Sequence, residues 1–463
     1  MSRLYPVKSR VAGTWVSTKI NFMQKRSAAT IYYIRDAVWA FNSGLIFNAL
    51  WVLYIDGMGL SLTQLSLMSI VITITVVLAE VPTGILADVY SRRLSVIMGG
   101  VLIGTCYILI GLFPLFWVSL LAAFIEAMGD SFVSGALQAW ITDEVGADKV
   151  GAVFLRSAQI SPVAHWVGLG VGIVLAALFD LRVPVLIGGL VWFVLSAFLV
   201  LAMPERGFVR PVETRNFASA RAASARAASA RAASLRSHFR EAVRTFSVGV
   251  GLVHGSPTLL MLFAVQVLLA VFFDSFYRLS RAHFLRSLAL PKIVVPLLGL
   301  LKANVWFGGF EALQGVLGLV GAGAVRRFVD LAKTRTLPKV LLGFYLLVFL
   351  GVLVFALTGH IVIAIVAWLM ANVLHQLAEP IISTWLNQNI PSDVRATVLS
   401  MSSQASMLGV LGGNPAISEV GDRFGLRPGL LLTGVLLLPV LGLFGHAVSN
   451  PIAAQHKLEE GAS

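Results

Sequence analysis

The chain has 463 residues, of which 57% are hydrophobic and only 12% are charged, roughly half the charged share of soluble domains. A soluble core cannot bury that much apolar surface, so the composition excludes a soluble enzyme, a disordered scaffold and a nucleic-acid-binding domain. The net charge of +13 then indicates basic loops that face anionic lipid. The single cysteine, Cys106, excludes an intramolecular disulfide and a cysteine-based metal site.

Long apolar runs divide the chain into two sets of six. Residues 1–30 form a basic N-terminus without the apolar core of a cleavable signal peptide. The N-terminal bundle, 31–203, has runs at 31–54, 63–86, 94–114, 116–140, 153–179 and 183–203. The C-terminal bundle, 256–448, has runs at 257–280, 303–325, 338–358, 361–386, 397–418 and 427–448. Because a helix of about 20 apolar residues spans a bilayer, the sequence predicts an all-α integral membrane protein with twelve transmembrane helices in two six-helix bundles.

Basic residues in the short loops set the expected orientation. The chain before Asp36 carries seven basic residues and no acidic one, so we expect the N-terminus to be cytoplasmic. With twelve spans the tail, 449–463, is cytoplasmic too, and we place the protein in the cell (inner or plasma) membrane. The segment 281–302 breaks the rule, because it puts Arg281, Arg286 and two lysines on the outer side. Its apolar part, 293–301, is too short to span and predicts a surface or re-entrant segment.

The gap between the bundles, 204–255, is a cytoplasmic linker rich in Arg, Ala and Ser. The unit Ser-Ala-Arg-Ala-Ala begins at Ser219 and recurs, so that arginines stand five residues apart. At that spacing they spiral around a helix and form no stripe. We interpret the gap as a helical or disordered low-complexity linker, with a tether to anionic headgroups as the alternative.

An internal repeat relates the two bundles. A shift of 245 residues aligns 139–159 with 384–404 without gaps, pairing Trp140 with Trp385 and Gln159 with Gln404. The two segments occupy the same place in each half, six spans apart. An even number of spans preserves orientation, so the sequence predicts two parallel, pseudo-symmetric halves with substrate bound near the midplane between them.

A charged signature lies between the second and third spans. It reads Glu-Val-Pro-Thr-Gly-Ile-Leu-Ala-Asp-Val-Tyr-Ser-Arg-Arg and begins at Glu80. Gly84 would let two helices approach closely, and Asp88 can reach an arginine or a helix N-terminus. With Arg92 and Arg93 it forms a charge cluster that can hold helices together in one state and release them in another.

This segment resembles the loop signature of the major facilitator superfamily, Gly-x-Leu-Ala-Asp-Arg-x-Gly-Arg-Arg. Six residues match, whereas Val89 and Ser91 depart from it; the matching residues are Gly84, Leu86, Ala87, Asp88, Arg92 and Arg93. A degenerate second copy would include Asp330. The resemblance extends over the whole chain in span count, central loop and repeat, and the lead-in from Glu80 looks like that of bacterial drug-efflux members.

The resemblance implies a secondary active transporter that works by alternating access. Within that class we favour proton-coupled efflux of small lipophilic or cationic molecules, as in multidrug antiporters. Two departures keep alternatives open: the fourth span lacks the usual arginine, and residues 160–172 carry glycines and a proline at spacings other than those of the antiporter motif. The alternatives are a proton-coupled importer of a small polar solute and a non-transporting receptor or lipid-handling protein.

Ionisable residues inside the spans are the candidate site, because each is costly in a bilayer. Glu126 and Asp130 stand four apart on one helical face, where two carboxylates can share a proton or capture a cation. Asp274 lies one turn from Arg278 and could form a structural ion pair with it. Packing or interhelical hydrogen bonding is the alternative for each candidate. The candidate residues for proton coupling or the substrate cavity are Glu126, Asp130, His165, Asp274, Glu311, His375, Glu379, Gln159 and Gln404.

No catalytic or nucleotide-binding motif accompanies these residues. The chain has no Walker-type loop, no His-Glu-x-x-His and no Gly-x-Ser-x-Gly, so we expect neither ATP-driven transport nor an enzyme, and no metal or cofactor. The expected partners are a small-molecule substrate, protons and membrane lipids, without nucleic acid. The resemblance implies a monomer.

Overall fold

A computed structural model describes residues 27–207, 251, 253–288, 290–291, 294–295, 299–300, 303–329, 336–391 and 394–450. The predictions for the basic N-terminus, the arginine repeat, Asp330 and the C-terminal tail lie outside these residues.

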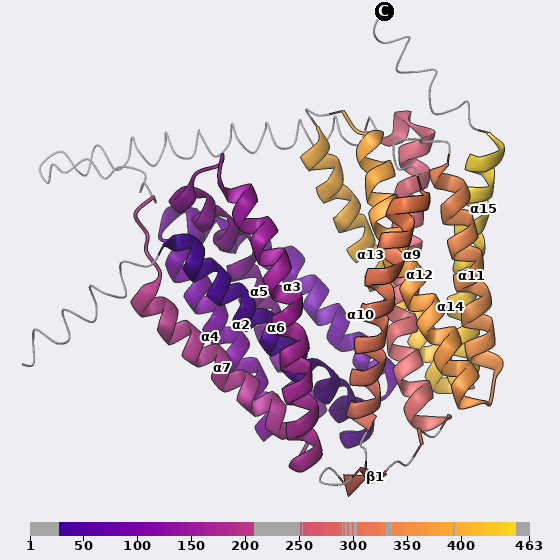
Figure 1. The fold of residues 1–463 in the computed structure, drawn as a ribbon, viewed down its shortest axis with the longest axis horizontal. Coiled ribbons are helices and arrows are strands. Elements are labelled where there is room, and N and C mark those ends of the chain that lie inside the picture. The colour runs from indigo at the N-terminus through magenta and orange to yellow at the C-terminus, as the bar shows by residue number, and fades with distance from the viewer. Residues whose placement is uncertain are drawn as a thin grey trace, which may run out of the picture. The chain divides into compact units, whose positions relative to one another are not determined.

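The first half consists of long helices joined by short turns (Figure 1). They are α2 (Ala28–Val52), which continues as the π-helix η1 (Leu53–Gly57), α3 (Leu62–Val89), α4 (Arg92–Leu112), α5 (Phe116–Val145), α6 (Val150–Leu178) and α7 (Arg182–Ala202). The second half contains α9 (Pro257–Arg286), β1 (Val294–Val295), β2 (Gly299–Leu300), α10 (Ala303–Phe328), α11 (Leu337–Leu357), α12 (Ile361–Gln388), α13 (Arg395–Phe424), α14 (Leu426–Val435) and α15 (Leu437–Ser449).

These helices confirm the twelve-span prediction. Eleven segments of the described chain are long and apolar enough to cross a membrane, and α14 and α15 together form one of them. The twelfth is α13, which is equally long but more polar. Large exposed side chains such as Leu78, Leu155 and Val194 are apolar, as expected for helices whose outer faces meet lipid.

The predicted boundary after the seventh span is wrong. Helix α9 continues six residues further, to Arg286, and Arg281 is only 4% exposed within it. The segment that follows contains a short antiparallel pair, β1 with β2, where we expected a surface or re-entrant segment. Arg281 and Arg286, which we assigned to the loop after the seventh span, therefore belong to helix α9.

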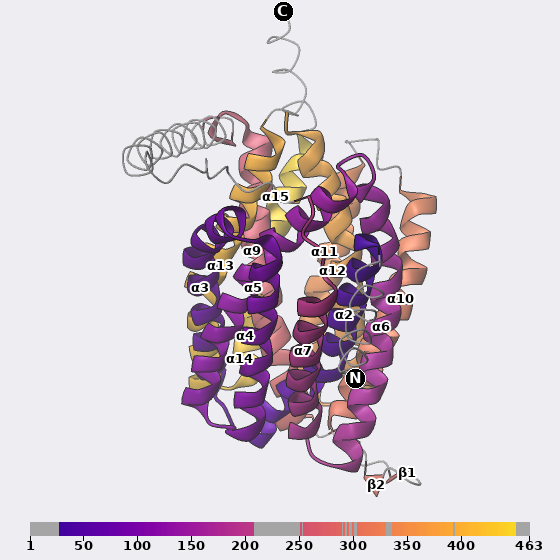
Figure 2. The same ribbon diagram turned by 90° about the vertical axis from the view of Figure 1, so that its left-hand side faces the viewer.

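Contacts divide the chain into two compact units. Unit 1 comprises Met1–Gly59, Val71–Glu213 and Ile293–Gly308, and unit 2 comprises Leu60–Ile70, Thr214–Lys292 and Gly309–Ser463. In unit 1, α2 packs along α6, and α4 packs against α5 and α7 (Figure 2). In unit 2, α9 packs along α13 and α11 along α12.

The same interhelical contacts recur in both units at repeat-related positions. Gly168 of α6 lies against the backbone of Phe41 in α2, and its counterpart Gly413 of α13 lies against Val271 in α9. Small residues at such contacts let membrane helices approach closely. The aligned residues thus occupy equivalent structural positions.

Candidate functional site

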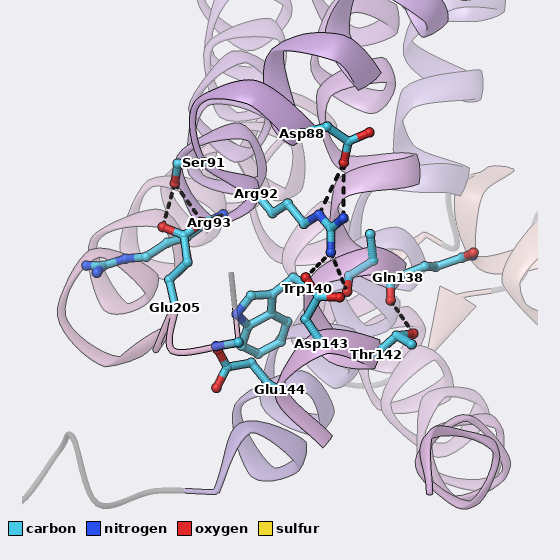
Figure 3. Close-up of polar contacts among 12 residues, drawn as sticks. Asp88, Ser91, Arg92, Arg93, Gln138, Trp140, Thr142, Asp143, Glu144 and Glu205 are labelled. Atoms are coloured by element: carbon cyan, nitrogen blue, oxygen red, sulfur yellow. Dashed lines mark hydrogen bonds and ion pairs between the residues drawn. The ribbon is translucent and has the colours of Figure 1, made fainter. Parts of the chain in front are cut away.

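The signature cluster joins the ends of three helices of unit 1 (Figure 3). The Ser91 hydroxyl accepts a hydrogen bond from the Leu94 N–H and caps α4. The next residue, Arg92, donates to Asp88 at the end of α3 at 3.2 Å, and to Asp143 and the Ala139 carbonyl of α5. One guanidinium therefore holds α3, α4 and α5 together.

A second carboxylate, Glu205, completes the cluster on the chain that follows α7. It accepts hydrogen bonds from the Ser91 hydroxyl at 2.8 and 2.9 Å and from the Arg93 N–H at 3.1 Å. The Arg93 guanidinium turns away and donates to the Val200 carbonyl. Alongside, the Trp140 indole donates to the Pro204 carbonyl at 2.6 Å. The start of the linker is therefore bound to the signature.

Sequence reasoning missed the acidic side of this cluster. Asp143 and Glu205 were not candidates, although Asp143 lies inside the repeated segment and Glu205 directly follows the sixth span. Glu144, beside Asp143, accepts a hydrogen bond from the Gly207 N–H at 2.8 Å. At Gly84 no described atom lies within 4 Å of an added Cβ, so no close helix approach requires glycine there.

The fourth-span carboxylates form a second group in unit 1. The Tyr107 hydroxyl of α4 donates to Glu126 at 2.7 Å, and the Cys106 thiol lies 3.9 Å from the same carboxylate. One turn along α5, Asp130 is exposed and lies within electrostatic range of the Arg35 guanidinium of α2. The structure therefore brings Asp130 of α5 together with a cation of another helix.

Arg35 itself is held among aromatic rings and a second carboxylate. Its side chain is 8% exposed, and it lies 3.6 Å from Asp36. The guanidinium carbon is 6.0 Å from the Trp39 ring centre and 5.9 Å from that of Trp192. These distances are within the range of cation–π attraction. A cation that is nearly buried thus has carboxylate neighbours in both α2 and α5.

Serine hydroxyls fix the position of Asp36. Ser157 and Ser161, one turn apart on α6, both donate to the same carboxylate oxygen, Ser161 at 2.6 Å. In unit 2 the counterpart Ser402 donates to Gln266 of α9 at 3.0 Å. In the described residues these contacts are made by the repeat-related serines, Ser157 and Ser402, and not by the repeat-related glutamines, Gln159 and Gln404.

Three other candidate residues, Gln159, His165 and Gln404, are less buried than Arg35. Gln159 and Gln404 are exposed. His165 is half-buried, and its backbone carbonyl faces Gly44 of α2. The repeat pairs Asp130 with His375, but the two lie in different units.

Unit 2 contains a polar network around Asp274. Its carboxylate accepts hydrogen bonds from Arg278 at 2.6 Å and from the Asn414 amide of α13. The amide oxygen of Asn414 in turn accepts from Ser275 at 2.8 Å. Because Arg278 is 1% exposed, the ion pair within α9 is well enclosed on the arginine side. The hydrogen bonds of Asn414 link it to α13.

His375 lies in a separate aromatic setting. Its ring stacks on Phe273 with 4.3 Å between centres, and its Nδ1 atom lies 3.1 Å from the Tyr345 hydroxyl. Nε2 faces Glu379 at 3.9 Å. His375 and Glu379, four residues apart on α12, are therefore adjacent in space, with Glu379 the more exposed member.

Glu311 has a cationic neighbour that its position in the sequence did not indicate. It lies in α10, within electrostatic range of Arg281 in α9. The Arg281 guanidinium carbon is 4.5 Å from the Tyr277 ring centre. Both units therefore place an arginine of their first long helix beside a carboxylate of another helix.

The fold and these enclosed charges define a polytopic membrane transporter. The family model of the major facilitator superfamily matches residues 37–413, so the chain belongs to that superfamily. A relative from Bacillus subtilis, described as the uncharacterized MFS-type transporter YxaM, is 27% identical over 131 residues. That match covers 28% of this chain and only a third of the relative's length. Proteins of this family are transporters and not enzymes.

Solved structures of transporters share the fold. A bacterial homolog of the human lysosomal transporter Spinster, inward-facing and unoccupied, superposes with a TM-score of 0.66 at 15% identity, over 91% of this chain and 96% of that one. A peptide transporter, POT, in complex with sulfate gives 0.63 at 13% identity, over 94% and 95%. The nucleoside transporter NupG gives 0.59 at 11% identity, over 91% and 99%. At these identities the likeness shows the fold alone.

Proposed function

We propose that the protein is a secondary active transporter that works by alternating access and couples the efflux of small lipophilic or cationic molecules to protons. The observation that carries the proposal is the group formed by Glu126, Asp130 and Arg35 in unit 1. An ionisable residue inside a membrane span is rare and usually functional. Here two carboxylates of one helix face share the region with a nearly buried guanidinium.

Proton exchange at Asp130 would change the partner of Arg35. While Asp130 is ionised, Arg35 has carboxylates on both sides, from α2 and from α5. When Asp130 binds a proton, its attraction for Arg35 is lost, and Asp36, 3.6 Å away, is the carboxylate neighbour that remains in this group. The change in pairing would pull on α2 relative to α5. The span-four arginine that drug antiporters usually carry is absent, and an arginine of α2 takes the place beside the span-four carboxylates.

The same group suits a cationic substrate. Glu126, Asp130 and Asp36 together carry two more negative than positive charges with Arg35 when all are ionised. A cation entering the group would lower that imbalance and would compete with protons for the carboxylates. Competition of this kind is the basis of antiport, because the carboxylates bind either the cation or protons at one time.

An importer of a small polar solute is the second candidate. It is favoured by the hydrogen-bonding groups of unit 2, where Asp274, Asn414 and Ser275 form a connected network. Solved neighbours named as peptide and nucleoside transporters have the same fold.

The test uses inverted membrane vesicles with an imposed proton gradient and a pH-sensitive dye. Lipophilic cations, other lipophilic compounds and small polar solutes are added to vesicles with and without the protein. We expect particular lipophilic compounds or cations to dissipate the gradient, and Glu126→Gln to abolish the response. Asp180→Asn is the matched control, because this exposed carboxylate lies in the turn between α6 and α7. Dissipation that survives in Glu126→Gln refutes the coupling role, and a response to polar solutes alone favours import.

A further inference from the structure

Helix α3 begins with a well-formed N-terminal cap. The Ser61 hydroxyl accepts from the Gln64 N–H at 3.1 Å, while the Gln64 side chain accepts from the Ser61 N–H at 2.9 Å. This reciprocal pair satisfies two backbone donors at the helix start. It leaves the N–H groups of Leu62 and Thr63, which a helix cannot satisfy internally.

A distant carboxylate binds these two groups. Asp422, near the end of α13, accepts from the Leu62 N–H at 3.0 Å with one oxygen and from the Thr63 N–H at 2.8 Å with the other. The residues are about 360 positions apart in the chain. An anion at a helix N-terminus also meets the positive end of the helix dipole.

Two arginines of α9 hold the same start of α3. Arg286 donates to the Leu60 carbonyl at 2.8 Å, just before the helix, and Arg278 donates to the Ser69 hydroxyl at 3.0 Å. Gly421, next to Asp422, lies so close to Leu62 that an added Cβ would be 2.6 Å from its side chain. The first turns of α3 are therefore bound to α9 and α13 along their length.

The division of the chain into compact units passes through this helix. Leu60–Ile70 belongs to unit 2, whereas Val71 and the rest of α3 belong to unit 1. The alternating access proposed above would require one unit to release a helix shared in this way. Among its contacts with unit 2, the Asp422 carboxylate is exposed. It stays hydrated, so its bonds can break without burying an unpaired charge.

We propose that Asp422 is a gating residue, whose carboxylate holds the start of α3 in unit 2 in this conformation and releases it during the transport cycle. The proposal rests on the alternating access proposed above. Substituting an amide leaves only one oxygen to accept, so at least one of the two N–H bonds is lost and the attraction between charge and dipole is removed. The released state should then become more populated.

The experiment measures how fast a thiol on the start of α3 reacts with a maleimide in proteoliposomes. Ser66 is wholly buried, so Ser66→Cys in a Cys106→Ser background reports its release. We expect Asp422→Asn to accelerate labelling about fivefold, the ratio that corresponds to loss of a helix cap. Glu419→Gln is the matched control, because that carboxylate, three residues earlier on α13, pairs with Arg423 of its own helix.

Equal labelling rates in Asp422→Asn and Glu419→Gln would overturn the proposal. Asp422→Glu, which keeps two carboxylate oxygens, is expected to label close to the parent rate. Acceleration by Asp422→Glu as large as that by Asp422→Asn would indicate misfolding and would also count against gating by the carboxylate. Labelling requires neither substrate nor a proton gradient, so the two experiments can fail independently. A protein that moves no compound in the vesicle assay contradicts the proposed function, whereas the labelling rates test the Asp422 contact.

Discussion

Substituting alanine for Gly168 tests how tightly α6 must pack against α2, the helix that carries Arg35 and Asp36. An added Cβ at Gly168 would lie 1.9 Å from the Phe41 carbonyl oxygen and 2.7 Å from its carbonyl carbon. Both atoms belong to the backbone of α2, so no side-chain rotation can relieve the contact. To reach an ordinary contact of 3.4 Å, α6 has to move away from α2 locally by more than 1 Å.

The expected cost follows from two opposing effects. Overpacking typically costs 1–3 kcal/mol, and a backbone obstacle places Gly168→Ala near the upper end, about 3 kcal/mol. Alanine also has a higher helix propensity than glycine, which raises the free energy of unfolding by about 1 kcal/mol. The net loss in the free energy of unfolding is about 2 kcal/mol. Gly413→Ala meets only the Val271 side chain, at 2.5 Å, so its net loss should be smaller.

The assay is the thermal unfolding midpoint of the purified protein in detergent at one fixed heating rate, which matters because membrane proteins often unfold irreversibly. Gly170→Ala is the control. Gly170 lies on the same helix as Gly168, and no described atom lies within 4 Å of its added Cβ. We expect the midpoints to rank Gly170→Ala above Gly413→Ala and Gly413→Ala above Gly168→Ala. If Gly168→Ala unfolds at the same temperature as Gly170→Ala, the close approach of α2 and α6 is refuted.

Three further changes address the polar groups directly. Tyr107→Phe removes the 2.7 Å hydrogen bond to Glu126 and should cost about 1–3 kcal/mol, with a matching loss of dye response in the vesicle assay. Ser161→Ala should lower the unfolding midpoint and Ser406→Ala should not. Ser161 bonds across to α2, whereas the hydrogen bond of Ser406 among the described residues is to the Ser402 carbonyl of its own helix. Arg92→Ala should change stability by at most about 1 kcal/mol, since its partners are partly exposed, yet reduce substrate flux well below the parent rate.

Each of these has a result that contradicts it. An unchanged dye response in Tyr107→Phe would separate Glu126 from coupling. Equal midpoints for Ser161→Ala and Ser406→Ala would mean that the bond to Asp36 contributes nothing measurable. Full flux in Arg92→Ala would remove the signature cluster from the transport cycle.

The span pattern was predictable because a bilayer imposes one length and one polarity on every crossing helix. The repeat was predictable because it preserves spacing, and it placed Ser157 opposite Ser402 in the alignment. It did not indicate which matched residues face a neighbouring helix. Gln159 was the more polar choice, but Ser157 is the buried member that bonds to α2.

The pairing of charges could not be predicted from the sequence. Arg35 and Asp130 stand on different helices, and nothing in local composition indicates that α2 and α5 bring them into electrostatic range. Hydropathy also ends the seventh span too early, because it counts Arg281 as a loop residue. In the structure that guanidinium lies over the Tyr277 ring and near Glu311, which allows the helix to continue.

The repeat also shows where the two halves differ in charge. Asp143 of the signature cluster is aligned with Gln388, and Asp36, which accepts from Ser157, has Gln266 at the equivalent contact with Ser402. At both positions unit 1 has an aspartate and unit 2 a glutamine, whose amide side chain is one methylene longer. A carboxylate can carry a negative charge and an amide cannot, so the two halves differ in charge at contacts that equivalent helices make. The repeat therefore preserves the helical frame and the contacts between helices, while the charge at those contacts is free to differ between the halves.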